Sequence, residues 1–275
     1  MKSPALVTSV LLILMGAQFR ESTATAQQQT TVSRPRTAVQ QKPAAAQTQW
    51  MSISIVRVKP DLIDEWIDFV KNETIPALKK AGIKERTAWQ TAQFGEAFEY
   101  IFITPVDSLA EYDGEPPIRK ALGDQAYRAY LEKSRRMTIS VRTYAVQSRP
   151  DLSHGRMEAP PKLAVVNEVQ VAPGRSQDFE TILKTEVLPA VRKAGVSGYL
   201  VSQQMFGGDA NVFTTVTPYE NFAEIGKGSP IQRAMGTAGY NRFLRRTAGV
   251  VTRVVRSIVR LNAELSIAAG LSETR

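Results

Sequence analysis

The sequence predicts an α+β protein in which two copies of a βαββαβ unit pack sheet to sheet within one chain. The first observation is a repeat: the segment Glu73–Gly82 returns 113 positions later as Glu186–Gly195, and a fixed offset of this kind marks a duplicated structural unit. The second is the order of strand-like and helix-like segments, which is the same in both copies. The third is that apolar residues occupy both the odd and the even positions of the strand segments, a pattern typical of strands covered on both faces.

The same offset holds along both copies without a gap. It pairs Pro60 with Pro173, Gln90 with Gln203, Gly95 with Gly208, Tyr127 with Tyr240 and Leu131 with Leu244. Two units of about 100 residues agree with usual domain sizes. We therefore expect the first unit at residues 49–148, a connector at 149–162, the second unit at 163–266 and a C-terminal tail at 267–275.

Each element of the first copy has its own local signal. Residues 51–58 are apolar and β-branched, which predicts a strand. Pro60 and Asp61 then open an amphipathic helix that ends at Gly82. Two strand-like runs, 85–94 and 97–104, flank the pair Gly95 and Glu96 and predict a hairpin. Next come a short helix at 118–122, a longer one at 125–136 and a last strand at 138–147. In the second copy the strands are expected at 165–171, 199–206, 212–217 and 250–260, and the helices at 177–194 and 231–246.

The βαββαβ order is that of a ferredoxin-like unit, whose sheet carries helices on one face only. The two bare faces of two such units can cover each other, so we expect an α/β barrel inside one chain. In this order of elements, and in the helix that ends in Pro76, Ala81 and Gly82, the chain resembles the dimeric α/β-barrel superfamily. That superfamily includes the antibiotic-biosynthesis-monooxygenase-like, EthD-like and NIPSNAP-like families. The resemblance covers residues 51–153 and 165–266, and it implies a fold far more than an activity.

The N-terminal residues indicate export. Lys2 precedes a short apolar run, and Ala24–Ala26 has the small-residue pattern of a signal-peptidase site. We expect residues 1–26 to be a signal peptide and 27–48, rich in Gln, Thr, Ala and Pro, to be a disordered low-complexity tether. The mature product would then be periplasmic or secreted, without stable membrane insertion, because the apolar run is shorter than the roughly 20 residues of a spanning helix.

Composition excludes several kinds of site. The chain of 275 residues has no cysteine, so disulfides, thiolate nucleophiles and cysteine metal sites are excluded. Its one histidine, His154, lies in the predicted connector, which argues against a Ser-His-Asp triad, multi-histidine metal sites and haem-binding relatives. We expect no metal and no cofactor. The formal charge is +9, and Lys and Arg occur in both units, so we expect a basic surface and no nucleic-acid partner.

Glu73 and Glu186 are the candidate catalytic residues. On a wheel of about 3.6 residues per turn, Glu73 falls within the apolar stripe of its helix, and Glu186 falls within the equivalent stripe. A carboxylate that faces a sheet is costly unless it is paired, hydrogen-bonded or protonated. Each is therefore either an acid or base in a pocket between helices and sheet, or a structural residue beside the helix prolines Pro76 and Pro189.

Seven further residues are candidates for substrate binding. Tyr127 and Gln90 are the expected hydrogen-bond partners of Glu73, and Tyr240 and Gln203 those of Glu186. Three positions differ between the copies and would distinguish two pockets. These are Trp89, Tyr100 and Glu168.

Two functions remain open from the sequence. One is an exported small-molecule-binding α/β-barrel protein, in the enzymatic case a cofactor-independent oxygenase or isomerase, as the resemblance implies. The other is a non-catalytic binding or interaction protein of the cell envelope. In either case we expect a monomer with an internal pseudo-dimer, and a small organic molecule as the ligand.

Overall fold

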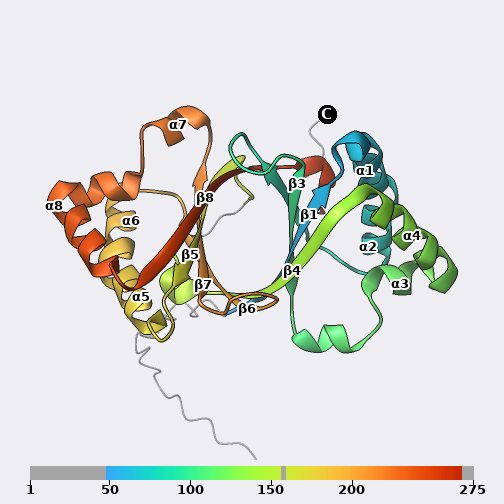
Figure 1. Ribbon diagram of the computed structural model, residues 1–275, viewed down its shortest axis with the longest axis horizontal. Coiled ribbons are helices and arrows are strands. Elements are labelled where there is room, and N and C mark those ends of the chain that lie inside the picture. Colours follow the sequence, from blue (N-terminus) through green and yellow to red (C-terminus); the bar gives the residue numbers. More distant parts are fainter. Residues whose placement is uncertain (1–47, 156–158, 268–275) are drawn as a thin grey trace, which may run out of the picture. The chain divides into compact units, whose positions relative to one another are not determined.

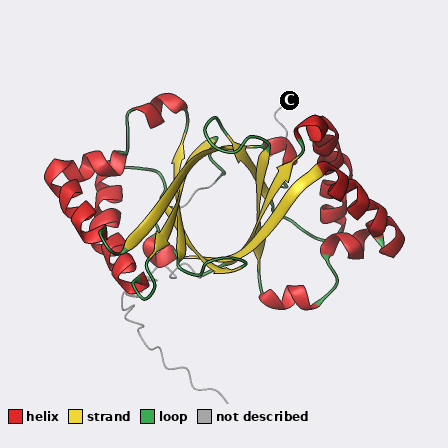
Figure 2. Ribbon diagram, in the orientation of Figure 1, coloured by secondary structure: helices red, strands yellow, loops and turns green. Residues whose placement is uncertain are grey.

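Eight strands form one closed antiparallel barrel with helices on its outside (Figures 1 and 2). The computed structural model describes residues 48–155 and 159–267. Around the barrel the strands follow the order β1-β3-β2-β8-β5-β7-β6-β4. Their bounds are β1 Trp50–Val58, β2 Thr87–Thr91, β3 Glu99–Val106, β4 Thr138–Ser148, β5 Leu163–Val171, β6 Leu200–Phe206, β7 Val212–Tyr219 and β8 Val251–Leu261.

The helices of each unit cover that unit's own part of the barrel. Those of the first unit lie on one side, and those of the second on the opposite side (Figure 1). The first set is α1 Ile63–Phe69, α2 Ile75–Lys80, α3 Pro117–Leu122 and α4 Asp124–Met137. The second set is α5 Ser176–Ile182, α6 Leu188–Ala194, α7 Phe222–Gly226 and α8 Pro230–Thr247.

The predicted duplication is confirmed by the structure. Strands β1 and β5, β3 and β7, and β4 and β8 have bounds that differ by the same 113 positions, as do the wide π turns η2 Val70–Thr74 and η5 Leu183–Val187. Each unit has the strand order 4-1-3-2 of a ferredoxin-like sheet. The two sheets join edge to edge at two seams, where β2 pairs with β8 and β4 pairs with β6, so no sheet edge remains open.

Three apolar clusters fill this architecture. One lies between sheet and helices in each unit, with Trp66 and Phe102 in the first and Phe179 and Phe213 in the second. The third lies inside the barrel, where Trp89 meets apolar residues of both units. The period-2 alternation of strands explains this arrangement, because successive side chains point to opposite faces.

The segments that follow β4 and β8 are exchanged between the units. We call residues 149–154 the first arm and 262–267 the second arm. Leu152 of the first arm is fully buried in the core of the second unit, and Leu265 of the second arm in the core of the first. Each arm also adds a backbone bridge, His154 with Tyr199 and Ile267 with Arg86. The predicted connector is thus a core-forming segment at its N-terminal end.

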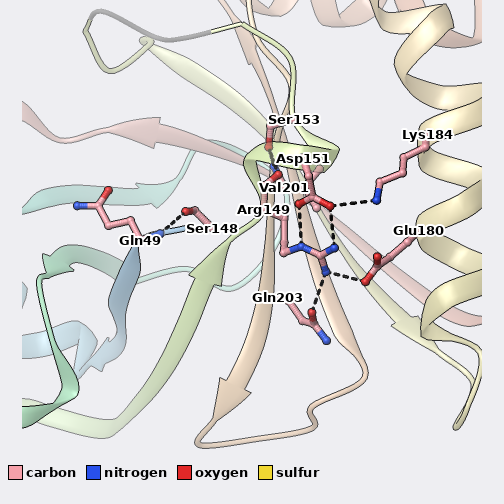
Figure 3. Close-up of polar contacts among 9 residues, drawn as sticks. All are labelled: Gln49, Ser148, Arg149, Asp151, Ser153, Glu180, Lys184, Val201 and Gln203. Carbon is pink, nitrogen blue, oxygen red and sulfur yellow. Dashed lines mark hydrogen bonds and ion pairs between the residues drawn. The ribbon is translucent and has the colours of Figure 1, made fainter. Parts of the chain in front are cut away.

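Arg149 is the main polar anchor of the first arm (Figure 3). Its Nε and Nη2 donate to Asp151 at 2.9 and 3.0 Å, and its Nη1 donates to Glu180 at 2.7 Å and to Gln203 at 3.1 Å. Lys184 adds an ion pair to Asp151 at 3.1 Å. These bonds join the first arm to helix α5, turn η5 and strand β6 of the other unit.

No helix among residues 48–155 and 159–267 combines the length and the apolar character that a bilayer-spanning segment needs. The predicted signal peptide, the predicted tether up to residue 47 and residues 268–275 lie outside the described residues.

Candidate functional site

A half-open pocket lies on the outer layer of the second unit, between the η5–α6 segment and α8. Its volume is about 230 Å³. Thr185, Glu186, Pro189 and Lys193 line it from one side, and Met235 is among the residues that line it from α8. Glu186, one of the two predicted catalytic residues, therefore lies at the edge of a pocket.

A break in helix α8 lies near this pocket, and the first unit has the equivalent break. Helix α8 is broken at Gly236, which has φ 67° and ψ 170°, a conformation open to glycine and costly for other residues. The first unit repeats the break at Gly123, with φ 77° and ψ 166°, where α3 ends and α4 begins. A wider hollow of about 570 Å³ lies at that equivalent break. The repeated glycine thus opens both helix layers at corresponding places.

Apolar residues form part of the pocket lining, and exposed cations lie at its rim. Pro189 and Met235 contribute apolar surface, whereas Lys193 and Arg242 bring exposed cations. In the described part of the chain neither cation makes an ion pair. Glu186 is neutralised by Arg246, whose Nη1 donates to its Oε1 at 2.5 Å. The net charge at the rim therefore favours a ligand with an acidic group.

The predicted burial of Glu73 is wrong. Its side chain is 42% exposed and accepts a hydrogen bond from Lys133 Nζ at 2.8 Å. Glu186 is better shielded, with 12% of its side chain exposed, but its partner is Arg246 rather than Tyr240 or Gln203. A catalytic role for either carboxylate remains a prediction.

The π turn explains the error. In η2 the backbone N–H of Ile75 donates to the carbonyl of Val70, five residues earlier, so this turn holds one residue more than an α-helical turn. The extra residue rotates all later positions relative to the earlier stripe. Thr74 and Ile75 are consequently buried on the helix face where a regular α-helical wheel would place Glu73.

The predicted tyrosine and glutamine partners serve other contacts. Tyr127 stacks with Tyr130 at a centroid distance of 6.3 Å, and Tyr240 with Phe243 at 6.0 Å. Gln90 accepts a hydrogen bond from Asn262 of the second arm at 2.8 Å. Gln203 accepts one from Arg149 of the first arm. The repeated glutamines thus bind the exchanged arms, and their prediction as partners of Glu73 and Glu186 is wrong.

The three candidate binding residues that have no identical counterpart in the other copy do not meet in one site. Trp89 lies in the barrel cluster, and its Nε1 donates to Thr87 Oγ1 at 3.1 Å. Tyr100 faces the opposite side of the sheet and packs against Trp66, with the ring centroids 4.5 Å apart and the ring planes tilted by 42°. Glu168 is exposed on β5, where its charge contributes to raising the pKa of Glu99, a shift caused mainly by the burial of Glu99.

Sequence reasoning missed Lys193, Met235 and Arg242 as pocket residues. Gly236 was the available signal, because a repeated glycine inside a helical pattern marks a break. The cations could not be recognised, since exposed Lys and Arg are common on every helix. Among residues 48–155 and 159–267, no cluster of three or more acidic or histidine side chains has a metal-binding arrangement.

No protein-family model and no curated protein matches the sequence. Solved structures do match the fold. An anthrone oxidase-like protein aligns at 12% identity over 79% of this chain and 93% of its own, with a TM-score of 0.55. A proposed monooxygenase from Lactobacillus acidophilus aligns at 10% identity over 78% and 94%, with a TM-score of 0.51. Chlorite dismutase from Candidatus Nitrospira defluvii aligns at 8% identity over 78% and 91%, with a TM-score of 0.50. The chain therefore has the dimeric α/β-barrel fold, with two ferredoxin-like units joined in one polypeptide.

Proposed function

We propose that the mature chain is an exported protein that binds a small organic acid in the pocket beside Glu186. The observation that carries this proposal is the combination of apolar lining residues with two exposed cations, Lys193 and Arg242, at one small concave site. Binding sites for small molecules generally combine apolar walls with a few polar groups that fix orientation. The formal charge of +8 on the chain from Gln27 onward adds long-range attraction for an acidic ligand.

The enzymatic form of this proposal is a cofactor-independent oxygenase or isomerase. The fold shared with an anthrone oxidase-like protein and a proposed monooxygenase supports it, although a fold alone does not fix an activity. Glu186 is the group placed to exchange a proton with a ligand in the pocket. The alternative is a binding or interaction protein of the cell envelope without catalysis.

A ligand-observed NMR screen of small organic acids against the mature protein tests the binding site. The Lys193→Ala change should weaken a bound acid about tenfold, because a charge-assisted hydrogen bond is lost. The first unit supplies a matched control, since Lys80 occupies the position equivalent to Lys193. Lys80→Ala should leave the affinity unchanged, and equal weakening by both changes would show that only overall charge attracts the acid.

Glu186→Gln separates catalysis from binding. The amide still accepts the hydrogen bond from Arg246, so the fold and the ligand affinity should be retained. If the protein is an enzyme, turnover of the ligand identified in the screen should be lost, because an amide does not exchange a proton. Full turnover in this variant would remove Glu186 from the mechanism, and no turnover in the wild type would favour the non-catalytic alternative.

Export is proposed from Lys2, the apolar run and Ala24–Ala26. Mass spectrometry of the protein recovered from its native host should give an N-terminus at Gln27. An intact Met1 on a cytoplasmic protein would contradict the proposal.

A further inference from the structure

Arg86 places a cation inside the helix–sheet layer of the first unit. The residue lies directly before β2, and its backbone exchanges two hydrogen bonds with Ile267 of the second arm, at 2.5 and 2.7 Å. The guanidinium lies over the ring of Phe102, with Cζ 3.8 Å from the ring centroid. Phe102 and Ile267 both belong to the buried core of this unit, so the charged group lies among apolar residues.

The guanidinium of Arg86 lacks a hydrogen-bond acceptor. Although the residue as a whole is half-buried, its Nη1 is buried and has no partner in the described part of the chain. Burial lowers the pKa of Arg86 to about 10, so the group is still charged at neutral pH. The ring of Phe102 offers a favourable cation–π contact, but a ring face leaves the N–H group without an acceptor and the positive charge without a counter-charge.

Two hydroxyl groups lie in the same layer. Thr74 Oγ1 from the π turn η2 and Tyr130 OH from α4 are 3.1 Å apart. Their mutual hydrogen bond uses one of the two hydroxyl protons, and the described residues give neither hydroxyl another partner. Burial raises the pKa of Tyr130, with the Thr74 hydrogen bond and the charge of Arg86 acting in the opposite direction. The phenol therefore keeps its proton at neutral pH, and the Thr74–Tyr130 pair has one O–H donor left in the helix–sheet layer that also holds the cation.

The second unit shows that the fold does not need this polar group. At the equivalent positions Arg86 is replaced by Tyr199, Phe102 by Thr215, Thr74 by Val187 and Tyr130 by Phe243. Tyr199 is buried, and that burial raises its pKa to about 12, while Thr215 accepts a hydrogen bond from Asn167 Nδ2 at 3.1 Å. The second unit thus has two neutral residues where the first has an unpaired charge over a phenylalanine ring.

We propose that the first unit binds a small monovalent anion, a halide or the carboxylate of a short organic acid, between Arg86, Tyr130 and Thr74. The anion supplies the acceptor that Arg86 Nη1 lacks and neutralises the buried charge. It also accepts the remaining hydroxyl proton. This site belongs to the other unit from the Glu186 pocket and does not depend on that pocket.

Thermal unfolding of the mature protein in chloride or in formate tests the site, with gluconate keeping the ionic strength constant. Binding to the folded state alone should raise the melting temperature saturably by a few degrees. A saturable rise in melting temperature with both anions would indicate a site for small anions in general. A rise with formate alone would indicate a site for the carboxylate of an organic acid. No saturable response to either overturns the proposal.

The second unit provides the matched variant. Arg86→Tyr combined with Phe102→Thr copies the neutral residues of the second unit into the first and should abolish the saturable response. Arg175→Met removes an exposed surface cation of the second unit and should preserve it. An equal response in the double variant would show a general salt effect and overturn the site. If the double variant does not fold, wild-type crystals soaked in bromide and, separately, in formate decide. An anomalous bromide peak or a formate within hydrogen-bond distance of Arg86 Nη1 supports the site, and a water there in both soaks overturns it.

Discussion

Replacement of Leu152 by alanine is expected to lower the free energy of unfolding by about 2–5 kcal/mol. Leu152 follows the last strand of the first unit, yet its side chain is fully buried in the core of the second, together with Phe179, Val191 and Phe213. Alanine leaves a cavity that a closed barrel and its packed helices cannot collapse to fill. Denaturant unfolding followed by circular dichroism measures the loss.

The repeat supplies an equivalent change and a control. Leu265→Ala removes the corresponding side chain from the core of the first unit and should cost a similar amount. Leu244→Ala removes a leucine that is 46% exposed and should change stability by no more than about 0.5 kcal/mol. Since each arm belongs to the other unit's core, both variants should unfold in one transition. An early transition of one unit, with the other unit's melting temperature unchanged, would contradict the reciprocal arrangement.

Arg149→Met is expected to cost about 2–3 kcal/mol, because three polar partners lose charge-assisted hydrogen bonds at once. The Arg149 and Glu180 side chains are only 17% and 23% exposed, so water replaces these bonds incompletely. Arg175→Met is the control, since Arg175 pairs with Asp178 on the surface and such pairs contribute at most about 1 kcal/mol. Equal losses in the two variants would show that Arg149 acts as an ordinary surface ion pair.

The same variant should change the response to acid. The hydrogen bonds from Arg149 are the main cause that lowers the pKa of Asp151 to about 2, with Lys184 contributing. A carboxyl group whose pKa is lowered by folding stabilises the protein fully above its ordinary pKa, and this contribution is lost as pH falls toward 2. The free energy of unfolding of the wild type should therefore fall between about pH 4 and pH 2. That of the Arg149→Met variant should fall less over the same range.

The barrel could be predicted from the sequence because its evidence repeats. A constant offset, matching strand segments and glycines at corresponding helix ends all favour the same duplicated unit, and consistent local signals of this kind specify a fold. The exchanged arms could not be predicted, because Leu152 and Leu265 are single apolar residues in short segments. Nothing in their local pattern tells which core they enter.

The candidate site was predictable only in part. Glu186 does lie at a pocket, but Glu73 does not have the predicted burial, because a wheel of constant pitch cannot anticipate a π turn. Arg86 had a usable signal in the repeat. A cation precedes the second strand of the first copy at the position where the second copy has Tyr199. Its unpaired N–H becomes visible only when the helix layer is in place.

Joining the two units in one polypeptide changes what a single substitution can do. In a barrel made from two identical chains, every mutation appears twice, on both sides of the symmetry axis. In this chain a mutation appears once, so one half can acquire a costly buried charge such as Arg86 while the other half keeps the neutral residues Tyr199 and Thr215 at the positions equivalent to Arg86 and Phe102. The fused barrel can therefore specialise one half for binding while the other half maintains its stability.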